Sequence, residues 1–369
     1  MRVKLGEVAR EDRETIRGSK NGIPVVGLEH LTSGEINLTE WDVDSENTFT
    51  KAFRKGQLLF GRRRAYLKKA AIAPFDGICS GDITVIEALP ERLLPSLLPF
   101  LIQNDAFFDY AVGKSAGSLS PRAKWEHLRN YEFNLPDIDE QRSLAETLWA
   151  FDEAKQAYKR LIATTDELVK CQFVEMFVHS NFPRKRIVDV CNTILDGDWI
   201  EAKDQSDSGI RLVQTGNVGN GTYLNKATRA RYISTSTFER LNCTEIFQGD
   251  ILISRLPDPI GRACELPELG ERMITAVDCA IIRLNQNVIN NNYFITYTKT
   301  EEYFSKVAEF SRGATRQRIS RRDLENIMLP LPDINIQNRF ADFVRHADKS
   351  KFIVFDALRL AEMYIKIVY

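Results

Sequence analysis

The feature that most constrains the fold is a short segment that occurs twice. The motif Leu-Pro-Asp-Ile begins at Leu135 and again at Leu331, and a glutamine follows it at the same distance, Gln141 and Gln337. The copies lie 196 residues apart, which is too far for a solenoid repeat and suits a duplicated half-protein. Each copy ends a segment of short strand-like runs and begins a segment of helical periodicity. We therefore predict two modules, each a globular part followed by a long helix.

After each copy, side chains recur at alternating steps of four and three residues, the spacing of a coiled-coil seam. The first seam consists of Leu144, Leu148, Phe151, Lys155, Tyr158, Ile162, Thr165 and Val169. The second, shifted by 196, consists of Phe340, Val344, Ala347, Lys351, Val354, Leu358, Ala361 and Ile365. Two matched stripes predict an antiparallel helix pair, with the first helix roughly 55–60 Å long. We expect the seam lysines to pair with a carboxylate or to extend past the seam; a role in setting the register is the alternative.

The globular parts have the texture of short strands separated by glycines, with helices expected between residues 93 and 110. Three strand segments of the first part have counterparts in the second, at offsets of 182, 187 and 193 residues; they begin at Lys4, Gly22 and Gly56, and at Arg186, Gly209 and Gly249. The predicted class is α/β (α+β). We expect a domain at 1–138, a spacer helix at 139–180, a second domain at 181–334 and a second helix at 335–369.

Composition limits the class of protein. The chain has 369 residues and a formal net charge of −1, so any nucleic-acid site must arise from local charge separation. Six cysteines without a CxxC pair, beside four histidines, argue against a zinc site or a disulfide framework. The sequence has no signal-peptide run and no apolar stretch of membrane-spanning length. We expect a cytoplasmic protein without metal or cofactor.

Two variable domains, each closed by Leu-Pro-x-Ile/Leu-x-x-Gln before a long helix, resemble the specificity subunit of type I restriction–modification systems. The resemblance covers the whole chain, and its most diagnostic segments are 135–142 and 331–338. The second departs from the usual Glu-Gln-Arg, with Ile336-Gln337-Asn338 in that place. The glycine-rich segments at Gly117 and Gly313 are also similar to the family. Specificity subunits of related type II enzymes share this layout.

The resemblance implies a function for each part. Each globular part, 1–138 and 181–334, would be a target recognition domain that binds one half of a split double-stranded DNA sequence. The helices would set the distance between the halves and bind two modification methyltransferase subunits, and restriction subunits would join the full complex. The chain itself would not be an enzyme.

Two segments rich in basic residues support a DNA contact. Residues 51–69 hold eight lysines and arginines, and residues 312–322 hold five arginines, and neither segment has an acidic residue. Guanidinium groups bind phosphates and guanine edges, although a solvated basic loop is the alternative. The candidate DNA-binding residues are Arg54, Lys55, Arg62, Arg63, Arg64, Tyr66, Lys114, Ser118, Arg122, Lys124, Arg255, Arg312, Thr315, Arg316, Arg318 and Arg321.

Matching positions differ between the modules, which predicts an asymmetric target. The run Arg-Arg-Ala at 63–65 corresponds to Leu-Pro-Asp at 256–258 under the 193-residue offset. Domains that share a scaffold but not their contact residues should bind different half-sites.

Catalytic hypotheses find little support. Pro136-Asp137 with Glu153 and Lys155 resembles a nuclease pattern, but Glu153 and Lys155 lie on one helix and Lys155 is a seam residue, whereas metal chemistry needs carboxylates that converge on one ion. A coiled-coil scaffold without DNA specificity is the other alternative, and it does not explain the acid-free segments. The sequence thus favours a non-catalytic DNA-recognition subunit.

Overall fold

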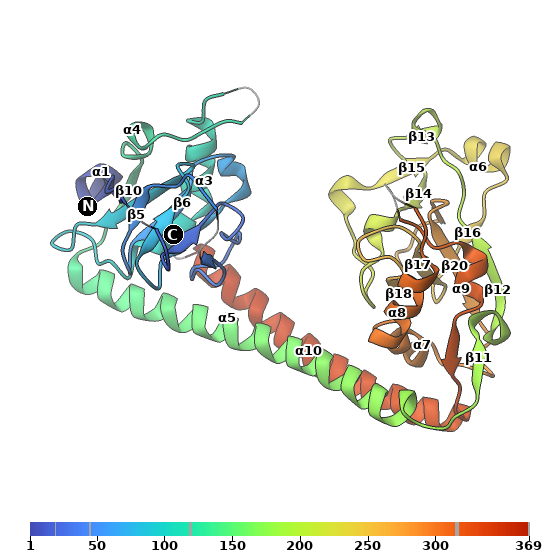
Figure 1. Ribbon diagram of the computed structural model, residues 1–369. Coiled ribbons are helices and arrows are strands. Elements are labelled where there is room, and N and C mark those ends of the chain that lie inside the picture. Colours follow the sequence, from blue (N-terminus) through green and yellow to red (C-terminus); the bar gives the residue numbers. More distant parts are fainter. Residues whose placement is uncertain (19, 44–45, 118–119, 314–316, 368–369) are drawn as a thin grey trace. The chain divides into compact units, whose positions relative to one another are not determined.

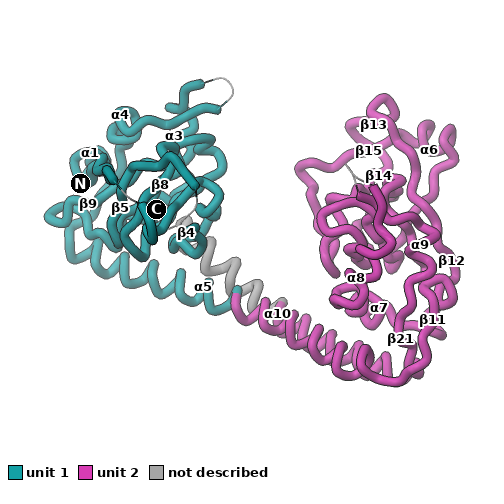
Figure 2. The backbone as a smooth tube through the Cα atoms, in the orientation of Figure 1, with its two compact units in different colours: residues 1–159, 355–369 teal, residues 160–354 magenta. Residues whose placement is uncertain are grey.

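The computed structural model describes residues 1–369 except 19, 44–45, 118–119, 314–316 and 368–369, and it describes side chains as far as residue 351. The backbone divides into two compact units (Figure 2). The first contains Met1–Lys159 and Phe355–Tyr369, and the second contains Arg160–Val354.

The first unit is a mixed α/β domain. Its elements are β1 (Arg2–Lys4), α1 (Leu5–Val8), β2 (Ala9–Asp12), β3 (Pro24–Val26), β4 (Asp42–Val43), β5 (Lys51–Phe53), β6 (Leu58–Gly61), η1 (Ala65–Leu67), β7 (Ala70–Ile72), β8 (Gly77–Cys79), β9 (Ile83–Ala88), α2 (Leu98–Gln103), α3 (Asp105–Gly113), α4 (Trp125–Leu128), β10 (Glu132–Asn134) and the first part of α5 (Ile138–Phe173). The strands form sheets of order β2-β9-β6-β7 and β4-β3-β8-β5 and a β1-β10 pair. Figure 1 shows this unit in blue to blue-green, followed along the chain by α5 in green.

The second unit repeats this plan. Its elements are the last part of α5, η2 (Val174–Val178), β11 (Arg184–Arg186), η3 (Ile187–Val190), β12 (Cys191–Asp196), η4 (Ala202–Asp204), β13 (Gln205–Ser206), β14 (Ile210–Val213), η5 (Thr215–Asn217), η6 (Ala227–Arg229), β15 (Arg231–Ile233), α6 (Thr235–Leu241), β16 (Glu245–Ile246), β17 (Ile251–Ser254), β18 (Ala263–Glu265), β19 (Met273–Thr275), β20 (Cys279–Leu284), α7 (Asn291–Tyr297), α8 (Glu301–Phe310), α9 (Arg321–Glu325), β21 (Met328–Pro330) and the first part of α10 (Ile334–Ile367).

The sheets of the second unit have the same strand order as those of the first. The order β12-β20-β17-β18 matches β2-β9-β6-β7, β15-β14-β19-β16 matches β4-β3-β8-β5, and β11-β21 matches β1-β10; β13 is an addition. In each unit one pair is parallel, β3 with β8 and β14 with β19. The predicted fold class, two duplicated α/β domains with long helices, is confirmed.

Strand alternation explains why the central strands β6 and β17 are almost wholly apolar. Leu58 and Phe60 of β6 pack in a cluster with side chains of α2, α3 and α5, whereas Leu59 packs in a cluster with β3, β5 and β8. Successive side chains of a strand point to opposite faces, so a strand covered on both sides is apolar throughout. In β17, Leu252 likewise faces the opposite cluster from its neighbours.

The repeated Leu-Pro-Asp-Ile segment starts the long helix and fixes it to the sheet. The Asp137 carboxylate accepts hydrogen bonds from the backbone N–H groups of Asp139 and Glu140, which caps the N-terminus of α5. Buried Gln141 accepts from Leu94 N (3.0 Å) and donates to the carbonyls of Arg92 (3.0 Å) and Pro136 (3.1 Å). The motif therefore joins the helix to the loop that follows β9.

The second copy makes the same contacts. Gln337 accepts from Asn290 N (3.1 Å) and donates to the carbonyls of Val288 (3.0 Å) and Pro332 (2.9 Å). Each of these partners lies 196 residues after its counterpart. The duplication therefore extends to individual hydrogen bonds.

The two long helices pack together in antiparallel fashion. Within the second unit, Phe173 contacts Phe340 with ring centroids 5.4 Å apart, and Asp166 forms an ion pair with Lys351 at 2.6 Å. Earlier positions of α5 thus meet later positions of α10. The predicted packing is confirmed for this stretch, whereas the side chains of Val354, Leu358, Ala361 and Ile365 lie outside the described residues.

The first half of the α5 stripe also packs against its own domain. Ala145 and Leu148 belong to the core cluster of the first domain. Lys155 pairs with buried Asp152 at 3.3 Å, and Lys351 pairs with Asp348 at 2.5 Å, so both seam lysines are paired with carboxylates, one of the two outcomes expected for them. No helix among the described residues has the length and apolar composition needed to cross a membrane.

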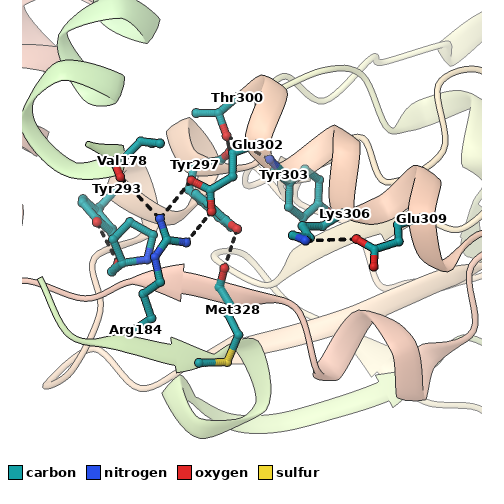
Figure 3. A network of polar contacts seen from close by, with 11 residues as sticks. Val178, Arg184, Tyr293, Tyr297, Thr300, Glu302, Tyr303, Lys306, Glu309 and Met328 are labelled. Carbon is teal, nitrogen blue, oxygen red and sulfur yellow. Dashed lines mark hydrogen bonds and ion pairs between the residues drawn. The ribbon is translucent and has the colours of Figure 1, made fainter. Parts of the chain in front are cut away.

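Figure 3 shows how polar side chains attach the β11-β21 pair to the helices of the second unit. The Arg184 guanidinium of β11 forms a two-point ion pair with Glu302 of α8. The hydroxyl groups of Tyr293 and Tyr297 donate to the carbonyls of Pro330 and Met328, both at 2.8 Å. These contacts position β21, which leads into α10.

Candidate nucleic-acid interface

The connection between β6 and β7 presents part of the predicted basic site. Arg64 and Lys68 flank η1 in the left-handed region, with φ of 55° and 51°. Arg64 and Tyr66 are exposed, Tyr66 at 55%. A tight turn thus places a guanidinium and an aromatic ring at the surface.

Backbone pairing brings a second predicted segment to this turn. Arg64 N donates to Pro121 O (2.8 Å), Ala123 N donates to Arg62 O (2.9 Å), and Arg63 forms a bridge with Arg122. Candidates Arg62, Arg63, Arg64 and Arg122 therefore belong to one region of the first unit, followed directly by exposed Lys124.

Two of these arginines have protein partners. Arg122 makes a two-point contact with Asp82, at 2.6 and 3.1 Å. Arg63 lies 3.5 Å from Asp82 and donates to the Ser120 hydroxyl. The hydrogen bond from Arg122 holds the pKa of Asp82 below its usual range, so this carboxylate is charged at neutral pH. Arg122 has a structural role, which leaves Arg64 as the more available guanidinium.

Two other candidates of the first unit, Arg54 and Lys55, lie apart from this region. Arg54 and Lys55 precede β6, whereas Arg62 to Arg64 follow it, so the strand separates them by roughly 13 Å. Arg54 pairs with Glu14 at 2.7 Å, in a hollow that also contains Glu11, Asp12 and Glu87. The basic residues of segment 51–69 therefore lie at both ends of β6. Lys114 is exposed, with its ammonium 5.7 Å from the Tyr110 ring centroid.

In the second unit the structure places Arg255 inside the domain. Its side chain is 5% exposed, pairs with Asp196 at 2.9 Å and donates to Val277 O. Burial lowers its pKa, although the guanidinium remains charged at neutral pH. Arg255 follows β17 directly, and Ile319 N donates to its carbonyl. A buried guanidinium contacts no ligand at the surface, so Arg255 is a structural residue.

Arg318 repeats the role of Arg122. Its guanidinium lies 3.4 Å from Asp278, which is 196 residues after Asp82, and its backbone pairs with that of Arg312. Arg321 forms ion pairs with Asp196 (3.2 Å) and Glu325 (3.0 Å). Arg312 is exposed. Candidates Ser118, Thr315 and Arg316 lie outside the described residues.

The sequence analysis missed one exposed basic segment. Residues 208–238 contain no Asp or Glu. Three cations of this stretch, Lys226, Arg229 and Arg231, are exposed, and within the described part of the chain they form no ion pair. The same search for acid-free segments that found residues 51–69 would have detected it.

Among the described residues, no group of three or more His, Cys, Asp or Glu side chains is arranged to hold a metal ion. Burial raises the pKa of the Cys79 thiol to about 12 and that of Cys279 to about 11. These buried thiols remain protonated at neutral pH.

Comparisons with known proteins identify the family. The family model described as "Type I restriction modification DNA specificity domain" matches twice, at residues 2–164 and 180–353. A putative type I restriction enzyme MjaX specificity subunit from Methanocaldococcus jannaschii is 18% identical over 377 residues, covering 94% of this chain and 84% of the relative.

Two solved structures are similar in fold. One, from a study of complex assembly and conformational transition of the type I R-M system, has a TM-score of 0.54 at 20% identity and covers 100% of this chain and 96% of that one. The type I S subunit from M. genitalium has a TM-score of 0.54 at 11% identity, with coverage of 99% and 95%. Because the family model matches both halves, this chain belongs to the type I restriction–modification DNA specificity subunits, the non-catalytic components that recognise the target sequence.

Proposed function

We propose that the two units are target recognition domains that bind the two different halves of a bipartite duplex DNA sequence, while α5 and α10 hold two modification methyltransferase subunits. The observation that carries this proposal is an opposite charge at matching positions of the two domains, an aspartate in the first and an arginine in the second.

The match follows from strand pairing. Asp42 of β4 pairs with Val25 of β3, and Arg231 of β15 pairs with Leu212 of β14. Val25 and Leu212 occupy the same place in the two sheets, 187 residues apart, so Asp42 and Arg231 are counterparts. A carboxylate repels a DNA phosphate and a guanidinium attracts it. The two domains should therefore contact DNA through different elements, which supports different half-sites.

Exposure separates the candidate contacts from the scaffold. In the first domain Arg64, Tyr66, Lys114 and Lys124 are exposed and remain our proposed DNA contacts. In the second domain the proposed contacts are Arg312, Lys226, Arg229 and Arg231. Residues with the same partner in both domains, such as Arg122 and Arg318, support the shared geometry. Phosphate contacts give affinity that falls with salt, and base contacts give roughly 1–3 kcal/mol each.

The start of α5 suits a protein partner better than DNA. Exposed carboxylates there include Asp139, Glu140, Glu146 and Glu153. They repel phosphates and complement a basic protein surface. We assign this face to a methyltransferase subunit. Restriction subunits would complete the type I complex, and one of the two similar solved structures comes from a study of the assembly of such a complex.

The proposal is tested by copurifying the chain with its cognate methyltransferase subunit and mapping methylated motifs genome-wide, with and without this chain. We expect a motif of two short halves separated by a fixed gap, lost on deletion. Arg64→Ala should relax one half and Arg229→Ala the other. Unchanged methylation after deletion, or equal relaxation of both halves by either single variant, would contradict the proposal.

A further inference from the structure

One loop of the first domain is hydrogen-bonded to α5. In the connection between β3 and β4, the Glu35 carboxylate accepts hydrogen bonds from Lys159 Nζ at 2.5 Å and from Gln156 Nε2 at 2.6 Å. Beside it, Lys155 Nζ donates to the Gly34 carbonyl at 2.9 Å. Three side chains from successive turns of the helix therefore converge on two residues of the loop.

The loop is itself fixed to the domain, so the contact is not a flexible tether. Gln103 at the end of α2 donates to the carbonyls of Glu35 (2.9 Å) and Ala70 (2.5 Å). Ile36, 4% exposed, accepts a backbone hydrogen bond from Ile72 of β7 at 2.7 Å. A continuous set of hydrogen bonds thus runs from the sheet through the loop to α5.

The negative charge of Glu35 strengthens the contact between the loop and α5. Burial alone would raise the pKa of Glu35, but the hydrogen bonds from Lys159 and Gln156 outweigh it and hold the pKa below its usual range. The carboxylate is therefore ionised at neutral pH. Its side chain is 20% exposed and that of Lys159 is 41% exposed, so the pair is partly shielded from water.

The second domain lacks these groups at the matching positions. Gly34 corresponds to Gly221, and both have positive φ, 78° and 85°. The next residue is Thr222 in place of Glu35, and the sequence has phenylalanine, at 352 and 355, in place of Gln156 and Lys159. The contact between this loop and α5 is therefore specific to the first domain and is not a consequence of the shared fold.

We propose that Glu35 is a positioning residue: its contacts with Gln156 and Lys159 fix the orientation of the first target recognition domain on α5. A fixed orientation restricts where this domain meets its half-site, and so narrows the range of gaps between half-sites that the complex accepts. This inference rests on the proposed function above.

The test is a panel of duplexes with the native half-sites at the native gap and at gaps one base pair shorter or longer, methylated by the complex of this chain with its cognate methyltransferase. For Glu35→Gln, we expect the preference for the native gap to fall by roughly three- to tenfold, the range for loss of one typical hydrogen bond. Lys159→Gln should give the same loss, and the double variant no more than either single one, because both remove one interaction.

Two controls separate positioning from folding and from charge. Glu40→Gln removes the same charge from the same loop, and within the described residues Glu40 forms no ion pair; its gap preference should stay at the wild-type value. Exchanging the charges, Glu35→Lys with Lys159→Glu, should restore part of the preference. A Glu35→Gln complex with wild-type gap preference would overturn the positioning role, as would an equal loss in Glu40→Gln. If the wild-type complex methylates no bipartite motif, the proposed function fails instead.

Discussion

Replacement of Gln141 by alanine tests whether the repeated motif locks the long helix to its domain. The side chain is 2% exposed and makes three hydrogen bonds, to Leu94 N, Arg92 O and Pro136 O. The substitution leaves these three backbone groups without a hydrogen-bond partner in a buried site. We expect the first unit to lose stability while its fold is retained.

The magnitude follows from the number of bonds. A typical hydrogen bond contributes about 1 kcal/mol, and an unsatisfied buried group costs about 1–3 kcal/mol, so three bonds correspond to about 3 kcal/mol. For a unit of this size that is a fall in Tm of roughly 6–12 °C. Tryptophan fluorescence during urea unfolding follows mainly the first unit, which holds three of the four tryptophans, Trp41, Trp125 and Trp149, with Trp199 in the second.

The duplicated chain supplies its own matched variant. Gln337→Ala removes the same three bonds from the second unit and should leave the main tryptophan transition in place, while hydrogen exchange quickens in β20 and α7. Gln286→Ala, which removes one exposed hydrogen bond, is the control and should shift neither unit measurably. If Gln141→Ala were as mild as Gln286→Ala, the lock interpretation of the motif would be refuted.

Substitutions at three other positions test the helix packing, the DNA contacts and the scaffold ion pair. Phe173→Ala should destabilise the second unit by about 3–5 kcal/mol in urea unfolding, since this buried ring packs among aromatic side chains where α5 meets α10. Lys226→Ala should lower the salt dependence of DNA binding by roughly one phosphate contact, read as the slope of log K against log salt. Asp82→Asn should lower Tm at pH 7, and the Tm of the variant should approach that of the wild type as the pH falls below about 4. The pKa of Asp82 is lower in the folded than in the unfolded protein, so its ion pair stabilises the fold at pH values above the unfolded pKa, and this stabilisation is lost on acidification.

The sequence predicted the duplication and the long helices because both depend on local pattern. The start of a helix needs a capping group such as Asp137, and a packed helix face needs apolar residues at alternating steps of three and four. Both signals can be found in the sequence alone. The sequence did not show which part of the protein packs on the first half of the α5 stripe. Leu148 is buried by its own domain, and periodicity states only that a face is covered.

Single contact residues are harder to predict than the fold, because a count of charges along the chain does not show where the strands place each charged residue in space. Arg54 and Arg64 belong to one acid-free segment, yet β6 places them at opposite ends, and Arg54 lies among carboxylates. Arg255 corresponds to Arg62 under the 193-residue offset, but its guanidinium is buried and pairs with Asp196. Burial of a charged side chain depends on its tertiary partner, which composition does not specify.

Comparison of the two domains with each other is the better guide, because they share a backbone and differ in side chains. Arg122 and Arg318 form ion pairs with matching aspartates, Asp82 and Asp278, so these pairs stabilise the common scaffold. A residue that selects DNA sequence in one domain has no reason to recur in the other if the half-sites differ. By that criterion Arg231, whose counterpart is an aspartate, is a stronger candidate for DNA contact than any arginine that both domains retain.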